Sequence, residues 1–234
     1  MTLKGSIIEI KDINEESINE MYQLMANFYD NVDYNVFLKD LYNKDYCIIL
    51  KENDTIRGFS TQKVINFTLN DKVIYGIFSG DTIIHKENWG SLELFQIFAK
   101  FFFDLGMQYD NFYWFLIVKG YKTYKILPAF FNSFYPTYRY DMPPEIKQIA
   151  DRFGEVFYKD EYNKTNGIIE YKSIKDKLKK GVADITDDKL QDLDIKFFSQ
   201  SNPDYINGND MVCITELRLE NLKEKAKPIL FGKK

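Results

Sequence analysis

Histidine and cysteine are scarce in this chain of 234 residues, which contains one histidine and two cysteines. His85 alone cannot build a multi-histidine metal site, and Cys47 and Cys213 are too far apart in the chain to form a C-x-x-C pair. We therefore predict no metal site. Both cysteines lie in apolar runs that are typical of inert core residues. A serine hydrolase triad could use only His85, and the chain contains no G-x-S-x-G pattern.

Long apolar runs are also missing. The longest ones, around 101–103 and over 112–118, are far shorter than the roughly 20 residues that span a bilayer. Residues 1–11 contain no apolar signal-peptide core. We therefore expect a cytoplasmic protein with no membrane span and with reduced thiols.

The chain has the composition that a folded core needs, because 45% of its residues are hydrophobic and 17% are aromatic. These fractions predict a soluble globular protein with one large domain or two small ones. The net charge is -4, and only four of the 31 basic residues are arginine. This balance argues against a dedicated nucleic-acid binder.

The spacing of apolar residues predicts the secondary structure. Strands are expected at 6–11, 46–50, 55–69, 72–85 and 112–118, and helices at 14–28, 33–42, 92–105, 122–131 and 146–157. The helix at 92–105 is apolar on nearly every side, which is typical of a helix sandwiched between layers. Pro128 is expected to kink or restart its helix. Prolines 136, 143 and 144 mark a break, after which 175–180 is expected to be a solvated helix face and 211–215 is strand-like.

The order of these elements resembles the GNAT superfamily of N-acyltransferases over roughly residues 5–140. A second similarity, at 119–131 and in the Asn-Pro…Gly…Cys segment of 202–213, is to an uncharacterised divergent group of GNAT-like proteins. The resemblance implies an α/β (α+β) fold with a mixed, mostly antiparallel central sheet flanked by helices. We expect a GNAT-like domain at 1–144 and a C-terminal extension at 145–234 that packs on it and completes the acceptor side.

In that family, backbone amides of the loop after the fourth strand hold the pyrophosphate of acyl-CoA, and the next helix points its N-terminus at the phosphates. The corresponding loop here is 85–91. Of the family pattern (Arg or Gln, Gly, any residue, Gly or Ala), only Gly90 matches, with Ser91 as a small neighbour, and the arginine is missing. The resemblance therefore implies acyl-CoA or acyl-phosphopantetheine as co-substrate, and it implies donor-binding roles for Asn88, Trp89, Gly90, Ser91, Lys119 and Lys122.

The resemblance also suggests catalytic groups. A carboxylate on the fourth strand often serves as the base in these enzymes, and Asp81 lies there; its alternative is to bond a turn beside Gly80. A tyrosine after the fifth strand commonly protonates the leaving thiolate, which suggests Tyr124 or Tyr121. His85, at the end of the strand, is a candidate base or a candidate hydrogen-bond donor to a phosphate; the alternative is a surface residue.

The resulting expectation is an acyltransferase that moves an acyl group from an acyl-CoA-like thioester to a small-molecule or peptide amine. Two alternatives remain open. One is an enzyme that takes longer acyl chains from an acyl carrier protein, and the other is a non-catalytic binding protein that kept the scaffold and lost its co-substrate.

Overall fold

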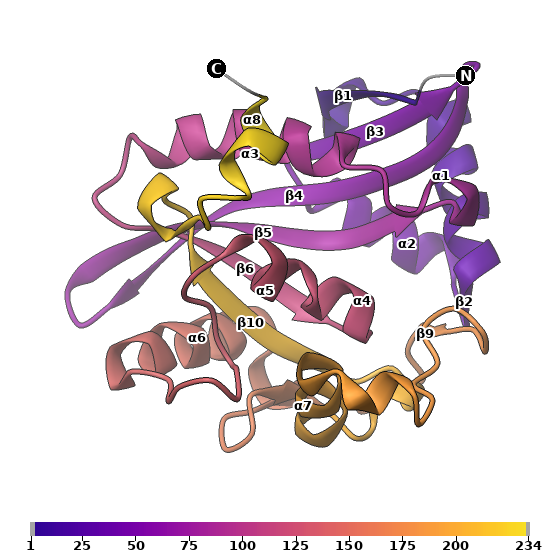
Figure 1. The fold of residues 1–234 in the computed structure, drawn as a ribbon. Helices are drawn as coiled ribbons and strands as arrows, with labels where there is room; N and C mark the ends of the chain where they lie inside the picture. Colours follow the sequence, from indigo (N-terminus) through magenta and orange to yellow (C-terminus); the bar gives the residue numbers. More distant parts are fainter. Residues whose placement is uncertain (1–2, 233–234) are drawn as a thin grey trace.

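The computed structural model describes residues 3–232, and a single large sheet crosses the molecule (Figure 1). Its strand order is β1-β3-β4-β5-β6-β10-β8-β7. The strands are β1 (Lys4–Glu9), β3 (Tyr46–Glu52), β4 (Thr55–Leu69), β5 (Lys72–Ile84), β6 (Phe112–Val118), β7 (Tyr162–Asn163), β8 (Ile168–Ile169) and β10 (Asp210–Glu216). Only the β5–β6 pair is parallel among these described strands. The expected mixed, mostly antiparallel central sheet is confirmed.

Helices cover both faces of the sheet (Figure 1). They are α1 (Glu15–Phe28), α2 (Tyr34–Tyr42), α3 (Glu93–Gly106), α4 (Tyr121–Tyr124), α5 (Ile126–Phe130), α6 (Pro144–Phe157), α7 (Leu193–Ser201) and α8 (Lys227–Phe231). Successive residues of a strand point to opposite faces. Accordingly Ile48 belongs to the cluster packed under α3, whereas Cys47 and Ile49 belong to the cluster under α1 and α2. Helix α6 covers Phe78 and Phe115, on the same face as α1 and α2.

Helix α3 is apolar nearly all round because it is covered on two sides. Its inner side packs on the sheet, and α8 packs on its outer side, where the rings of Phe103 and Phe231 meet edge to face at 5.6 Å. Gln96 Nε2 also donates to the Ile229 carbonyl at 2.8 Å. The sandwiched helix expected from the sequence is confirmed.

Pro128 restarts its helix, as expected: α4 ends at Tyr124, and Pro128 lies in the first turn of α5. One expectation differs from the structure. The Lys/Asp-rich run is not a helix, because its β9 (Lys177–Leu178) pairs with β2 (Tyr29–Asp30). Strand β10, which follows residue 144, lies between β6 and β8 in the sheet.

Within residues 3–232, no helix has both the length and the apolar character that a membrane span requires. The same residues contain no group of three or more metal-ligating side chains with a suitable arrangement.

Candidate functional site

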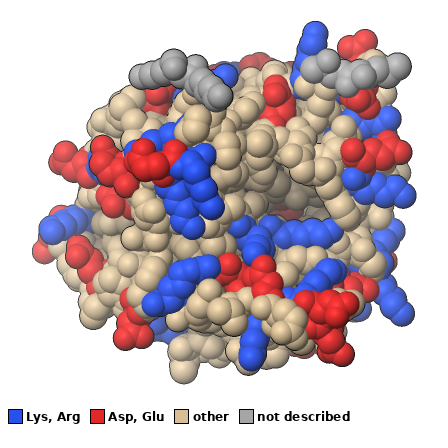
Figure 2. All heavy atoms as spheres, viewed as in Figure 1, with Lys and Arg blue, Asp and Glu red and all other residues tan. Residues whose placement is uncertain are grey.

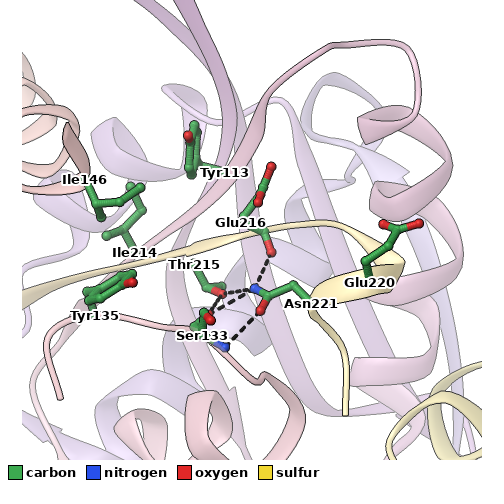
Figure 3. A pocket seen from close by; sticks show the side chains of 9 residues that line it. All are labelled: Tyr113, Ser133, Tyr135, Ile146, Ile214, Thr215, Glu216, Glu220 and Asn221. Carbon is green, nitrogen blue, oxygen red and sulfur yellow. Dashed lines mark hydrogen bonds between the residues drawn. The ribbon is translucent and has the colours of Figure 1, made fainter. Parts of the chain in front are cut away.

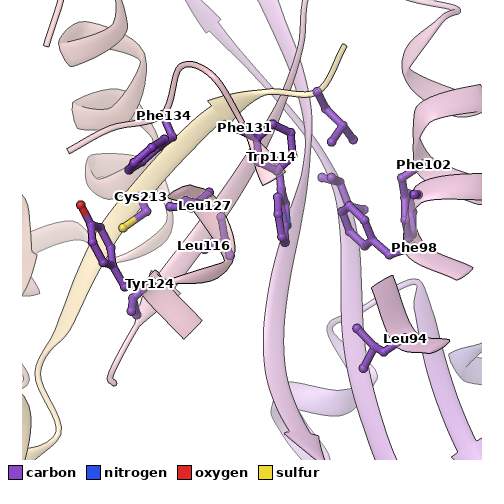
Figure 4. Close-up of a cluster of buried hydrophobic side chains, with 14 of the residues drawn as sticks. Leu94, Phe98, Phe102, Trp114, Leu116, Tyr124, Leu127, Phe131, Phe134 and Cys213 are labelled. Carbon is purple, nitrogen blue, oxygen red and sulfur yellow. The ribbon is translucent and has the colours of Figure 1, made fainter. Parts of the chain in front are cut away.

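The two parallel strands separate before they end. Pairing between β5 and β6 runs from Tyr75 opposite Phe112 to Ser79 opposite Leu116, although β5 continues to Ile84. A narrow cleft opens beyond that point, and Figure 4 shows Leu94 and Phe98 of α3 on one side of it with Trp114 and Leu116 of β6 on the other. The cleft is lined by Ser60, Gln62, Ser79, Gly80, Thr82, Leu94, Phe95, Phe98, Trp114, Leu116, Ile117, Thr123 and Ile126. A slender, mostly apolar chain is the ligand shape that suits it.

A β-bulge lies at the same point of β5. Ser60 pairs with Thr82 and Gln62 with Ser79, so that two residues of β5, Gly80 and Asp81, face a single residue of β4. Glycine is required at position 80, because a Cβ there would lie 2.7 Å from Lys44 Cε and 2.8 Å from the Thr61 hydroxyl. Bulges re-aim side chains next to sites of chemistry, and this one sets the direction of Asp81.

Asp81 is partly buried and has no hydrogen-bond or ion-pair partner among the described residues. Burial, together with the nearby carboxylate of Asp40, raises its pKa to about 7, while Lys44 and Lys175 act in the opposite direction. Lys44 itself is engaged by Asp40, to which its Nζ donates. A free carboxylate that titrates near neutrality has the property that a general base needs.

A buried chain of hydrogen bonds forms one wall of the cleft. Trp114 Nε1 donates to Ser79 Oγ at 2.8 Å, and Ser79 donates to Gln62 Oε1 at 2.5 Å. Gln62 Nε2 donates to Ser60 Oγ at 2.7 Å, and Ser60 Oγ lies 2.6 Å from Thr82 Oγ1. A fully satisfied network of this kind holds its members rigidly. Sequence reasoning missed it, although Ser60, Gln62 and Ser79 occupy same-face positions on neighbouring strands.

The C-terminal segment adds a charged cluster on the face of α1, α2 and α6. Lys119 Nζ contacts Asp176 at 3.0 Å and Asp210 at 3.4 Å, and Lys175 pairs with Asp176 at 2.8 Å. Tyr171 donates its hydroxyl to Asp210 at 2.8 Å. Burial raises the pKa of Asp210; at Asp176 burial acts the same way, but Lys119 and Lys175 hold the pKa below its ordinary value.

Two members of this cluster, Asp176 and Lys175, are among the charges that shift the pKa of the Asp81 carboxyl. Figure 2 shows a hollow to the right of centre, bordered below by Lys and Arg side chains. The run at 175–180, expected to be merely solvated, therefore contributes charged residues around the candidate base. Its position depends on the β2–β9 pairing, which links segments more than 140 residues apart.

Backbone amides are free at the start of α3. In the loop and first turn, Asn88, Trp89 and Ser91 donate to carbonyls within the loop. Among the described residues, the amides of Gly90, Leu92, Leu94 and Phe95 have no acceptor. Two of these residues, Leu94 and Phe95, line the cleft. Unpaired amides at the N-terminus of a 14-residue helix favour an anion at the entrance of the cleft.

Trp89 and Lys122 connect the loop that follows β5 with the helix that follows β6, across the point where the two strands separate. The indole of Trp89 donates to the Ile84 carbonyl at 2.8 Å and packs on Phe28, with ring centroids 6.2 Å apart. Lys122 Nζ, from the helix that follows β6, lies 3.3 Å from the centre of the Trp89 ring. Burial and the neighbouring Lys189 lower the pKa of Lys122. A cation is therefore present beside the loop after β5.

The structure places the other candidates away from the cleft. Tyr124 is fully buried and donates its hydroxyl to the Pro136 carbonyl at 2.9 Å, and its ring packs on Phe198 of α7. Burial raises its pKa well above the ordinary value. Tyr121 is also buried, under Lys189 at 5.1 Å. From α4 it is Thr123, and not a tyrosine, that lines the cleft.

His85 and Lys119 serve other contacts. His85 Nδ1 accepts from the Glu87 amide at 3.4 Å and so caps the short turn that follows β5. Lys119 is used by Asp176 and Asp210 on the far face, which leaves it unavailable for a phosphate at the loop. Cys47 and Cys213 are both buried, and burial raises the pKa of each thiol.

No protein-family model matches the chain, and no curated protein matches it. Among solved structures, it is similar to a conserved protein of unknown function from Enterococcus faecalis, at 13% identity and a TM-score of 0.43 over 57% of this chain and 33% of that chain. It is also similar to ElaA from Escherichia coli, at 13% identity and a TM-score of 0.40 over 61% of this chain and 95% of that one. The toxin AtaT, bound to acetyl-CoA and the C-terminus of the antitoxin AtaR, is similar at 14% identity and a TM-score of 0.38, over 56% and 85%. Likenesses this weak transfer no substrate or residue role to this chain.

Proposed function

We propose that this protein transfers an acyl group from a pantetheine thioester to an amine. The observation that carries the proposal is the free carboxylate of Asp81, which stands in a bulge of β5 just beyond the residues that pair with β6. Its pKa of about 7 leaves it able to accept a proton at neutral pH. The cleft and the charged hollow then provide separate places for donor and acceptor.

The donor side is the cleft between β5 and β6. The free amides of Gly90, Leu92, Leu94 and Phe95 hold the phosphate end, and Lys122 adds positive charge beside them. The accessible volume of the cleft is about 20 Å³, so its mostly apolar walls must part further to receive the pantetheine arm. These residues fit acyl-CoA as well as the phosphopantetheine of a carrier protein.

The acceptor side is the region around Asp81, where Lys44, Lys175, Asp40 and Asp176 lie close enough to act on its carboxylate. An ammonium group that enters it is attracted by the unpaired carboxylate, whereas the lysines nearby are engaged by other aspartates. Asp81 takes a proton from the amine, and the freed nitrogen pair forms a bond to the thioester carbonyl carbon. The C–S bond then breaks, and Thr123, which lines the cleft, donates a hydrogen bond from its hydroxyl to the departing thiolate. The nitrogen gives up its second surplus proton to the thiolate, and the proton held by Asp81 leaves to solvent, so that an amide and a free thiol are formed.

Two measurements test the proposal. Asp81→Asn removes the base while keeping the shape of the side chain, and turnover should fall by about 100-fold or more. A thermal-shift panel with CoA, acetyl-CoA, long-chain acyl-CoA and acylated carrier protein identifies the donor, since a ligand at roughly 100 times its Kd adds about 2.7 kcal/mol of stability. A response to the carrier protein alone would select the carrier-dependent enzyme. No response to any of these donors, combined with an unchanged rate in Asp81→Asn, would overturn the proposal.

A further inference from the structure

A second cavity, of about 390 Å³, lies at the other end of the sheet (Figure 3). Its walls come from β6, β10, the start of α6 and the turn that follows β10, and they include Tyr113, Tyr135, Ile214, Glu216 and Glu220. A cavity of this size is large enough for a small organic molecule. Nothing in the proposed acyl transfer uses it.

The cavity is distinct from the site around Asp81. Residues 210, 212, 214 and 216 of β10 point to one face of the sheet, with Asp210 at one end of the strand and Glu216 at the other. Six residues of strand separate Asp210, in the charged cluster, from Glu216, which corresponds to roughly 20 Å. The intervening face is covered by α6, whose Ile149 and Phe153 pack on Val212 and Ile214.

Several polar groups around the cavity have hydrogen-bonding capacity that no described residue uses. The Glu220 carboxylate and the hydroxyls of Tyr113 and Tyr135 have no partner among the described residues. Glu216 uses one carboxylate oxygen, Oε1, to accept from Arg218 Nε at 3.0 Å, and its other oxygen is free. Arg218 directs its remaining contacts to the carbonyls of residues 109 and 110. The two carboxylates, Glu216 and Glu220, therefore outnumber the one arginine, Arg218, which pairs with Glu216.

The floor of the cavity is already rigid. Asn221 donates to the Ser133 carbonyl at 3.0 Å, to Thr215 Oγ1 at 3.0 Å and to the Glu216 carbonyl at 2.9 Å, and its own oxygen accepts from the Ser133 amide at 2.9 Å. A site whose polar groups are held before binding loses little entropy when a ligand arrives.

The apolar part of the cavity complements its charge. Figure 3 shows Tyr135, Ile146 and Ile214 grouped on one side, with Glu220 on the opposite side. Burial and the carboxylates of Glu216 and Glu145 raise the pKa of Tyr113, while Arg218 acts in the opposite direction. Aromatic rings and carboxylates together attract cations that carry hydrocarbon.

We propose that this cavity binds a small organic cation of the alkylammonium class. The ammonium donates to the carboxylates of Glu216 and Glu220, and the alkyl chain packs against Tyr113, Tyr135 and Ile214. The carboxylates of Glu216 and Glu220 repel carboxylate and phosphate ligands. This binding does not depend on the proposed acyl transfer.

Isothermal titration calorimetry on the full chain at low ionic strength tests the proposal with three probes of equal length: 1,5-diaminopentane, pentane-1,5-diol and glutarate. We expect heat of binding from the diamine alone. Glu220→Gln should weaken diamine binding by about ten-fold, since a charge-assisted hydrogen bond is worth about 1.5–3 kcal/mol. Glu224→Gln is the matched control, because Glu224 lies four residues further on and its carboxylate pairs with Lys227.

Each remaining outcome decides the question. Equal binding of the diol would show that charge is not recognised and would overturn the proposal. Diamine binding that survives both Glu220→Gln and Glu216→Gln would do the same. Binding abolished by Asp81→Asn but unaffected by Glu220→Gln would assign the cation to the acyl-acceptor site instead. No thioester is present in these titrations, so a failure of acyl transfer leaves their outcome unaffected.

Discussion

Replacement of Asp81 by asparagine should make the protein more stable at pH 8 while making it inactive. The wild-type carboxyl has a pKa of about 7 in the folded protein against an ordinary value of 3.8. Between those values the folded state holds a proton that the unfolded chain has lost, so stability falls as the pH rises from about 4 to about 7. Because asparagine carries no charge at any of these pH values, Asp81→Asn does not lose this stability as the pH rises.

The size of the effect follows from the shift. A difference of about three pKa units corresponds to about 4 kcal/mol at 1.36 kcal/mol per unit. Since solvent reaches the Asp81 carboxylate, screening reduces this figure, and we expect a gain of about 2 kcal/mol above pH 7. In a chain of this length that gain raises the Tm by about 4–8 °C.

Urea unfolding of the wild type and of Asp81→Asn, at pH 4.5 and at pH 8, measures the difference. Asp104→Asn is the control, because it makes the same substitution at an exposed aspartate on α3. Turnover should rise through about pH 7 in the wild type and lose that limb in Asp81→Asn. A stability difference equal at both pH values, or a less stable Asp81→Asn at pH 8, would refute the raised pKa and with it the proposed base.

Three further outcomes follow from contacts in the structure. Thr123→Val should lower kcat several-fold, because Thr123 lines the cleft. Tyr124→Phe should leave kcat within about two-fold and lower the free energy of unfolding by about 1 kcal/mol, because it loses the hydrogen bond to the Pro136 carbonyl. The reverse pattern in steady-state kinetics would return the acid role to the tyrosine. Gly80→Ala should cost about 1–3 kcal/mol in denaturant unfolding, because its Cβ would collide with Lys44, and an unchanged midpoint would disprove the tight bulge. Lys119→Met should cost about 3–5 kcal/mol at pH 7 and less at pH 4, since Asp176 and Asp210 lose their shared cation; equal losses at both pH values would exclude this ion-pair origin.

The positions of most helices and strands were determined by the sequence itself. The strand expected at 112–118 is β6, and the strand expected at 55–69 is β4. Apolar spacing reports these elements because it arises from local geometry, which repeats every two residues in a strand and every 3.6 in a helix. Local spacing also placed Asp81 on its strand, next to Gly80, with which it forms the bulge.

Only the tertiary structure decided which side chains share a site. Tyr124 and Thr123 are adjacent in sequence, yet Thr123 lines the cleft and Tyr124 packs on α7, because the short helix α4 is oriented by contacts with α7, about 70 residues further along the chain. The run at 175–180 contributes charges around Asp81 only through its pairing with β2, and Glu216 meets Tyr113 only because β10 enters the sheet beside β6. Such placements depend on packing between distant segments, and local spacing carries no information about that packing.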